Sequence, residues 1–323
     1  MRRNINQEVI EGRVFEHDLA LKTVQNQQSE NFGKEFINGS ISVATDEAGL
    51  NVLTVHYTYV TEFTKQGKPN ATYSNLKKII EGKTWVKDGK DEAIKVRLST
   101  SAALNDFYPQ GNDELVSQPR NEGGFVSIMS NLNPEGINRQ KFTFDTIITG
   151  VSLVEKNPEN NIAKDYVKIK CVIFNFKNEI LPFTLVAKSE GAINYFLNLD
   201  ASPSNPVYTQ VWGEIVNTTV VVTKTVESAF GEPTVDTSER QQKEWIITGA
   251  KPEPYLFGEP ETITVEELNE AIANRNVYLE EVKTRAKEYY ASRNNSNDPL
   301  PFGDVPSPTK NTNTTIPVGE FKF

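Results

Sequence analysis

The chain has 323 residues, of which 37% are hydrophobic, and a formal net charge of −9. That length allows two domains of ordinary size and a tail, whereas a single cysteine and two histidines argue against an intramolecular disulfide and a zinc cage. The acidic balance is weak evidence against a surface that binds phosphate everywhere, although it leaves room for a local basic strip.

The start of the chain has two arginines but no apolar run behind them. No window approaches the roughly 20 apolar residues that a membrane span needs. We therefore expect no signal peptide and no membrane association. The expected location is the cytoplasm, which is that of the host cell if a phage encodes the chain.

The first half of the sequence predicts short strands. Residues 9–15 form a strand broken at Gly12, and residues 36–45 alternate between apolar and polar side chains, which is typical of a half-buried strand. Residues 50–63 are dense in Val, Thr and Tyr and are expected to pair with that strand. After extra material at 64–93, we expect a strand at 94–98, a short helix at 102–107, a loop at 109–124 and a strand at 125–129.

The second half predicts a shorter succession, with a hairpin at 166–188, a helix near 191–199 and strands at 209–223 and 244–249. One clear helix follows, because Thr264 can act as its N-cap and Glu267 completes a capping box. This helix is expected to end near Ser292. Residues 293–323 are rich in Asn, Pro and Thr and are expected to stay disordered.

The two halves repeat one another in order. Four blocks match: residues 147–151 with 9–13, 166–173 with 36–43, 180–185 with 50–55, and 192–196 with 103–107. We therefore predict a first domain at 1–140 with an inserted loop at 64–93, and a second domain at 141–257. A C-terminal helix at 258–292 and a flexible tail at 293–323 complete the chain.

Each copy has the order strand, hairpin, short helix, strand, strand, which is the element order of an oligonucleotide/oligosaccharide-binding (OB) barrel. The second copy resembles the single-stranded DNA-binding proteins of bacteria and their phages in the hairpin 165–188 and the strands 211–215 and 244–249. The resemblance implies a mainly β fold of tandem OB-fold-like five-stranded barrels that bind single-stranded DNA.

A short element of the tail extends this resemblance. It is similar to the acidic Pro-Phe tip by which that family recruits replication and repair partners, and it consists of Asp298, Pro299, Leu300, Pro301 and Phe302. Here the element is internal and its acidic run is thin. The resemblance implies that replication or recombination proteins bind through this tail.

Sequence-tolerant binding of a single strand needs cations for the phosphates and aromatic faces for the unstacked bases. In the second hairpin, inward-pointing aliphatic residues would leave an outward set of Lys168, Lys170, Phe174 and Phe176. The alternative is that the tail helix or another subunit covers this face. Trp212 should also point outward, either to stack on bases or to fill a seam between domains.

The first copy is poorer in charge on the equivalent strand. Its candidates lie on the partner strand and in the insertion: Tyr57, Tyr59, Phe63, Lys65, Lys68 and Trp85. For Tyr57 and Tyr59 a place in the core is the favoured alternative, because Leu53 and Val55 share their face.

The sequence contains no recognisable catalytic constellation, metal-ligand cluster or cofactor motif. Both histidines are interpreted as surface or half-buried residues, and Cys171 as core packing. We therefore predict a non-enzymatic single-stranded DNA-binding protein of phage replication or recombination type, without a cofactor. The alternative is a structural or assembly protein of a phage particle or large complex, built from the same duplicated β domains.

Overall fold

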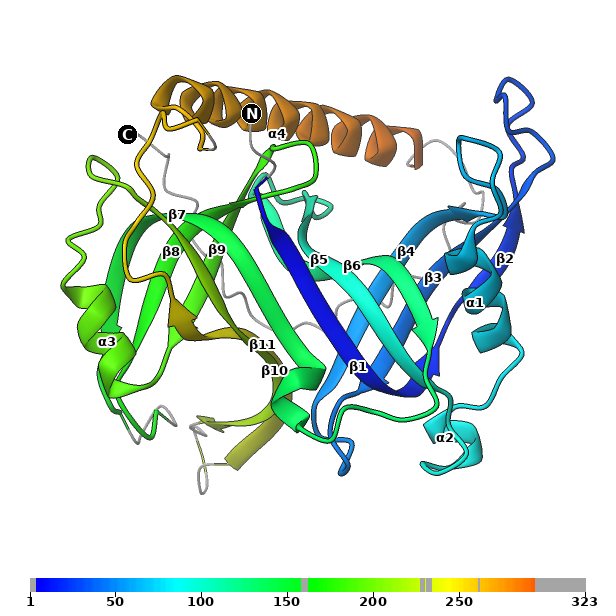
Figure 1. Cartoon of the computed structure of the whole chain (residues 1–323), viewed down its shortest axis with the longest axis horizontal. Helices are drawn as coiled ribbons and strands as arrows, with labels where there is room; N and C mark the ends of the chain where they lie inside the picture. Colours follow the sequence, from blue (N-terminus) through cyan, green and yellow to red (C-terminus); the bar gives the residue numbers. More distant parts are fainter. Residues whose placement is uncertain (1–3, 158–161, 227–229, 231–233, 261, 294–323) are drawn as a thin grey trace.

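The computed structural model describes residues 4–157, 162–226, 230, 234–260 and 262–293 (Figure 1). Strands dominate it, and a long helix follows them. In chain order the elements are β1 (Asn6–His17), β2 (Ala20–Thr23), β3 (Glu35–Ala44), β4 (Val52–Thr61), α1 (Ala71–Ile80), α2 (Trp85–Asp88), β5 (Lys95–Phe107), β6 (Val116–Ile128), the 3-10 helix η1 (Gly136–Arg139), β7 (Gln140–Val154), β8 (Tyr166–Phe174), β9 (Ile180–Ala187), α3 (Glu190–Leu197), β10 (Val207–Val226), β11 (Thr234–Ala250) and α4 (Val265–Arg293).

The first barrel is closed by β1, β3, β4, β6 and β5. β1 pairs antiparallel with β3 and β5, β3 pairs antiparallel with β4, and β5 with β6. The circle closes through a short parallel pairing of β4 with β6. α1 follows the third strand of this series, and β2 adds to β3 outside the barrel. This strand order with a helix after the third strand is that of an OB barrel.

The second barrel repeats this order with β7, β8, β9, β11 and β10. β7 pairs antiparallel with β8 and β10, β8 with β9, and β10 with β11. β9 and β11 meet in a parallel pairing between Val186 and Ile246. α3 again follows the third strand, so the chain is mainly β and contains two OB-fold-like barrels in tandem.

Three of the four matched sequence blocks fall on equivalent strands, and the fourth match is wrong. Residues 192–196 lie in α3, as expected, but residues 103–107 belong to β5. The predicted short helix at 102–107 does not form because β5 pairs with β6 along its whole length. β6 itself begins at Val116, inside the predicted loop 109–124, so sheet pairing overrides the local composition of both segments.

The helix of the first barrel is α1, which lies in the predicted inserted loop 64–93. Asn70 caps it, and the Asn70 side chain accepts a hydrogen bond from the Thr72 amide at 3.1 Å. Tyr73, Leu76 and Ile79 recur at helical spacing and are buried. α1 therefore occupies in the first barrel the place that α3 takes in the second.

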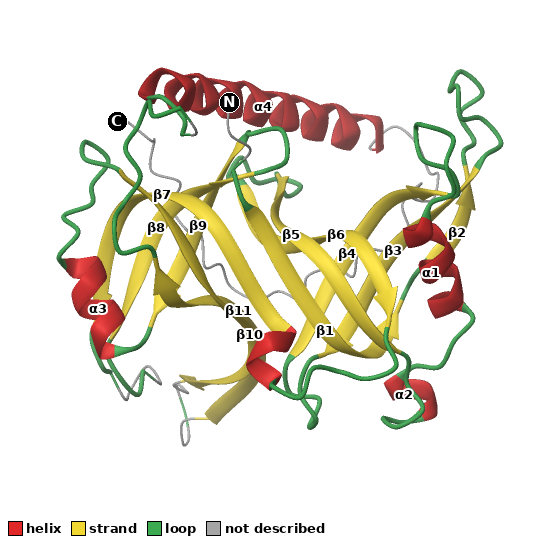
Figure 2. Ribbon diagram, viewed as in Figure 1, coloured by secondary structure: helices red, strands yellow, loops and turns green. Residues whose placement is uncertain are grey.

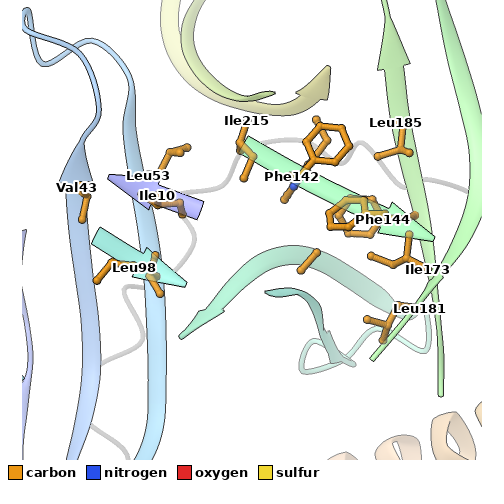
Figure 3. Close-up of a cluster of buried hydrophobic side chains, with 14 of the residues drawn as sticks. Ile10, Val43, Leu53, Leu98, Phe142, Phe144, Ile173, Leu181, Leu185 and Ile215 are labelled. Carbon is orange, nitrogen blue, oxygen red and sulfur yellow. The ribbon is translucent and has the colours of Figure 1, made fainter. Parts of the chain in front are cut away.

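The two barrels join edge to edge through their first strands. β1 pairs antiparallel with β7, from Asn6 opposite Phe144 to Ile10 opposite Gln140, and this makes one continuous 11-stranded sheet. One hydrophobic core runs through both barrels, as Figure 3 shows for Ile10 and Leu98 on one side and Phe144 on the other. Truncating a ring such as Phe142 or Phe144 to alanine would cost about 3–5 kcal/mol.

A buried polar cluster crosses this junction. The Glu8 carboxylate on β1 accepts hydrogen bonds from Trp245 Nε1 at 2.8 Å, Asn121 Nδ2 at 2.8 Å and Thr100 Oγ1 at 3.0 Å. Lys243 on β11 donates to the Asn121 side chain. Burial raises the pKa of Glu8, and the Lys243 charge opposes that rise. Burial lowers the pKa of Lys243 to about 8, and Glu8 counteracts this shift.

The long helix α4 begins on the second barrel and ends against the first (Figure 2). The predicted capping box is confirmed, because the Thr264 amide donates to Glu267 Oε2 at 3.0 Å and the Glu267 amide to Thr264 Oγ1 at 3.1 Å. Further along, Arg275 forms an ion pair of 2.7 Å with Asp106 on β5. Within the described ranges, no helix combines the length and apolar character that crossing a bilayer requires.

Candidate nucleic-acid interface

OB barrels bind extended ligands across the outer face of their second and third strands and the adjoining loops. In this chain those strands are β3 and β4 in the first barrel, and β8 and β9 in the second. The sequence-predicted residues can therefore be sorted by whether they reach one of these two faces.

A β-bulge separates the two tyrosines of β4. Gly39 pairs with Tyr57 and Ile37 with Val60, so β4 has two residues between these pairs where β3 has one. Tyr57 points inward and is 2% exposed, whereas Tyr59 is 45% exposed on the outer face. The expectation that both rings share one face is thus wrong, because the bulge reverses the alternation.

The Tyr57 ring lies over Gly123 of β6. A Cβ atom at position 123 would stand 2.2 Å from that ring, so only glycine leaves the necessary space. Burial raises the pKa of Tyr57, and its hydroxyl has no hydrogen-bond partner in the described part of the chain. Tyr57 therefore belongs to the core and is removed from the candidate interface.

Tyr59 belongs to an exposed aromatic group on the first barrel. Its ring lies 4.7 Å from that of Phe36 on β3, and Phe63 beyond the end of β4 is 53% exposed. Lys65 and Lys68 are exposed in the turn that follows Phe63. We call these five residues the β3–β4 face: Phe36, Tyr59, Phe63, Lys65 and Lys68.

Phe36 was not among the predicted residues, although its signal is present in the sequence. It stands one position before the inward-pointing Ile37, so strict alternation on β3 directs it outward. Lys22 on β2 was missed for a different reason. It reaches the β3–β4 face by donating a hydrogen bond to Asn38 Oδ1 at 3.1 Å, and no local pattern predicts the pairing of β2 with β3.

The second barrel presents a smaller exposed strip. Lys168 and Lys170 on β8 are both exposed, as expected, beside the inward-pointing Val167 and Ile169. Lys170 pairs with the exposed Thr184 on β9, and Lys168 pairs with Val186. We call Lys168, Lys170 and Thr184 the β8–β9 face. Its chemistry suits phosphates more than bases, because no aromatic ring stands among the three.

Phe174 does not join this face, which corrects the prediction that it is exposed. It is 1% exposed in a second hydrophobic cluster that also contains Val172 of β8, Tyr208 of β10, and Ile263 and Leu268 from the C-terminal segment. The alternation along β8 is as expected, but the chain after β11 returns and covers the outer side of that strand end. The start of α4 and the segment before it therefore cover Phe174, one of the four residues predicted on this face.

Phe176 is exposed but belongs to the turn between β8 and β9. It is 71% exposed, and Lys177 Nζ lies 5.7 Å from its ring centroid. It lines a cleft of about 290 Å³ together with Asn175 and, across the junction of the barrels, Gln7 and Ser101. Phe176 is thus at the end of the second barrel that faces the first.

Neither of the two predicted tryptophans lies on the faces of the second and third strands. Trp212 is on β10, where it is 40% exposed and rests on Gly249. Trp85 begins α2 and is half-buried, with its ring 5.8 Å from that of Phe15 and 5.7 Å from Lys90 Nζ. The contacts of Trp85 are those of a residue that packs α2 against β1.

The described residues contain no group of three or more His, Cys, Asp or Glu side chains that could hold a metal ion. Cys171 packs in the core as expected, and burial raises the pKa of its thiol to about 12. Burial lowers the pKa of both His17 and His56. The predicted partner-binding element Asp298–Phe302 lies outside the described residues.

Comparisons with known proteins complete these observations. The family model described as YorF matches residues 6–285, and no curated protein sequence matches the chain. Among solved structures, the chain is similar to the wild-type single-stranded DNA binding protein from Thermus aquaticus, with a TM-score of 0.44, 11% identity, and coverage of 79% of this chain and 95% of that chain. A deletion mutant of the same protein gives a TM-score of 0.45, 13% identity, and coverage of 81% and 100%. At these low scores, the fold assignment rests on strand order and pairing.

Proposed function

We propose that this chain, which belongs to the YorF family, is a non-enzymatic protein that binds single-stranded DNA without sequence preference. The observation that carries the proposal is the contact of the exposed Tyr59 ring with the half-buried Phe36 ring near Lys22, on the strands that OB barrels use for oligonucleotides. Aromatic rings accept unstacked bases of any sequence, and lysines neutralise the phosphates. The β8–β9 face of the second barrel adds two further cations.

The mechanism follows from the two faces. Bases leave their stack and lie against the rings of Phe36, Tyr59 and Phe63, where each contact contributes about 1–3 kcal/mol. Lys65 and Lys68, and Lys168 and Lys170 on the second barrel, contact the sugar-phosphate backbone. A net charge of −9 is compatible with this arrangement because the cations act locally and the rings contribute the remaining affinity.

The finer setting is also part of the proposal. We place the protein in the cytoplasm, in phage DNA replication or recombination, with Asp298 to Phe302 as a recruiting element for other replication proteins. What supports this is the similarity of that element to the acidic Pro-Phe tip of single-stranded DNA-binding proteins.

The proposal is tested with a matched pair of tyrosine variants. Tyr59→Ala should weaken oligo-dT binding roughly fivefold to hundredfold at low salt, because it removes one stacking ring, and it should leave thermal unfolding nearly unchanged. Fluorescence anisotropy of labelled oligo-dT measures the affinity. Tyr57→Phe is the control and should bind like wild type, since it alters only a buried hydroxyl. The proposal fails if the wild-type chain does not bind oligo-dT, or if Tyr59→Ala lowers the melting temperature without changing the affinity.

A further inference from the structure

The pairing of β1 with β7 creates a second exposed surface, which lies across the junction of the barrels. Five strands run side by side there in the order β10, β7, β1, β5 and β6 (Figure 1). In the pairing register, Thr143 lies between Trp212 and Gln7. The residue after Gln7, Glu8, pairs with Thr100 of β5. One step along the strands, Lys141 pairs with Val9, and Val9 pairs with Ser99.

The inward side chains of these strands define which residues point outward. Phe142 on β7, Ile10 on β1 and Leu98 on β5 are in the common core. Their neighbours along each strand, and the residues paired with those neighbours, therefore lie on the opposite side of the sheet, where Glu11 is covered and the others are exposed or half-buried. We call the outward set the seam face: Trp212, Lys141, Gln7, Ser99, Arg97 and Phe125.

Two exposed rings mark the ends of the seam face. Trp212 is 40% exposed on β10, and Phe125 is 75% exposed on β6, next to Ser99 of β5. They are four strands apart, which corresponds to about 19 Å. The floor between them consists of Gln7, Thr143, Ser99 and the half-buried Val9, none of which has a long or bulky side chain except Gln7, so a flexible chain could lie across it.

The cations of the seam face lie between and beside the rings. Lys141 is exposed on β7. Arg97 is exposed on β5, and its guanidinium group is 3.2 Å from the buried carboxylate of Glu11, which holds it in place. One carboxylate, that of the half-buried Glu214, lies opposite Lys141. The surface therefore combines two exposed rings with two cations, which are the two kinds of side chain that bind bases and phosphates of a single strand.

We propose that the seam face is an additional binding path for single-stranded nucleic acid, which carries a strand from one barrel to the other. Bases stack on Trp212 and Phe125, and the backbone passes Lys141 and Arg97. This inference rests on the proposed function, since it adds a path to the same ligand. Trp212 is the most exposed of the three tryptophans, although it lies away from the β8–β9 face. A binding path across the seam face gives this exposed ring a role.

The test uses strands of two lengths and the intrinsic fluorescence of Trp212. In a Trp85→Phe background, the remaining tryptophans are the exposed Trp212 and the buried Trp245, so quenching by oligo-dT reports on Trp212. A long oligonucleotide that spans both barrels should quench this signal. The double variant Lys141→Gln with Phe125→Ala should lose about tenfold or more in affinity for the long strand, and should bind a short strand that occupies one barrel as wild type does.

Leu153→Ala is the matched control, because Leu153 is also an exposed apolar side chain but lies at the far end of β7. It should bind both lengths like wild type. The inference is overturned if the double variant binds the long strand normally while Tyr59→Ala still weakens binding. It is overturned in favour of a contact between copies if the double variant changes only the sedimentation of the protein. Absence of binding by wild type at both lengths would instead refute the proposed function.

Discussion

Glu8 is the buried carboxylate on which the junction of the barrels depends. Trp245 reaches it from the second barrel, and Asn121 and Thr100 reach it from the first. Lys243 of the second barrel donates to Asn121, and its charge acts on Glu8. A buried charge that loses its counter-charge is costly, because its remaining hydrogen bonds replace only part of the lost hydration. The cluster therefore ties the relative position of the barrels to the hydrogen bonds of Glu8 and to the nearby charge of Lys243.

We predict that Glu8→Gln destabilises the fold by about 3–5 kcal/mol at pH 6.5, because Lys243 then stays charged without its partner. The pKa of Lys243 is lowered to about 8 in the folded chain, below its usual 10.5. Its attraction to Glu8 is therefore present below pH 8 and fades as the pH rises through that value. The loss caused by Glu8→Gln should shrink at pH 9.5, as urea unfolding at both pH values would measure.

Glu11→Gln is the control for that experiment. Its partner Arg97 stays charged across the whole range, so its effect on the free energy of unfolding should be the same at both pH values. An equal, pH-independent loss for Glu8→Gln would contradict the role assigned to Lys243.

Single residues also show where the alternation of side chains along a strand predicts exposure correctly and where it does not. It places Lys168 and Lys170 correctly, because β8 is regular over Val167 to Cys171. It misplaces Tyr59, because a bulge between Tyr57 and Val60 inserts a residue that no local pattern indicates. Burial by a distant segment is equally invisible from a strand's own pattern, which is why Phe174 was expected at the surface.

Among the elements, α4 connects the barrels over the top of the sheet. Its start is fixed by Leu268 in the first turn and by Ile263 just before the helix, both of which belong to the second hydrophobic cluster. Its middle is fixed on the first barrel by the ion pair of Arg275 with Asp106, whose side chains are 10% and 1% exposed. The Tyr290 hydroxyl donates to the Tyr108 carbonyl at 3.2 Å further along. The helix thus acts as a strut between the two barrels.

We predict that Arg275→Met destabilises the chain by about 3–5 kcal/mol, since Asp106 would remain buried without a counter-charge. Amide hydrogen exchange should become faster from residue 276 onward, because the second half of α4 loses its main attachment to β5. Urea unfolding measures the loss of stability. Arg285→Met is the control, because its pair with Glu281 is about two-thirds exposed on both sides and contributes less than about 1 kcal/mol. Similar losses for both variants would contradict the strut.

The elements were predictable to different degrees for physical reasons. The start of α4 follows from the capping box of Thr264 and Glu267, which is a local interaction. The second half of β5 was mistaken for a helix, because its conformation depends on pairing with β6 rather than on its own residues. The sequence match between residues 103–107 and α3 leaves no counterpart for α1 in the second copy, so α1 falls in the predicted insertion 64–93.

At the scale of the whole molecule, the net charge is −9 and the candidate cations lie in local groups. The salt dependence of binding therefore reports how many phosphates these groups contact. We predict that the double variant Lys168→Gln with Lys170→Gln reduces the slope of log affinity against log salt by about 1.4, which corresponds to two contacts of a single strand. Oligo-dT titrations at several salt concentrations measure the slope. Lys188→Gln is the control, since Lys188 is engaged by Glu244 at 2.5 Å. An unchanged slope in the double variant would remove the β8–β9 face from the interface.

The architecture as a whole was more predictable than its surfaces. The duplication in the sequence predicts two barrels because each copy carries the same order of elements. The junction through β1 and β7 was not foreseen, since the residues of two edge strands carry no signal that selects one partner over another. The seam face and the single shared core both follow from that pairing.

The antiparallel register of β1 and β7 relates the two barrels by an approximate half-turn. A polynucleotide has a 5′ and a 3′ direction, so one strand that runs straight across meets the second barrel in the reverse orientation to the first. Equal use of both barrels would require the strand to double back. The β3–β4 face carries rings, whereas the β8–β9 face carries only lysines and a threonine. This difference agrees with a protein whose two barrels bind the strand in opposite 5′ to 3′ orientations.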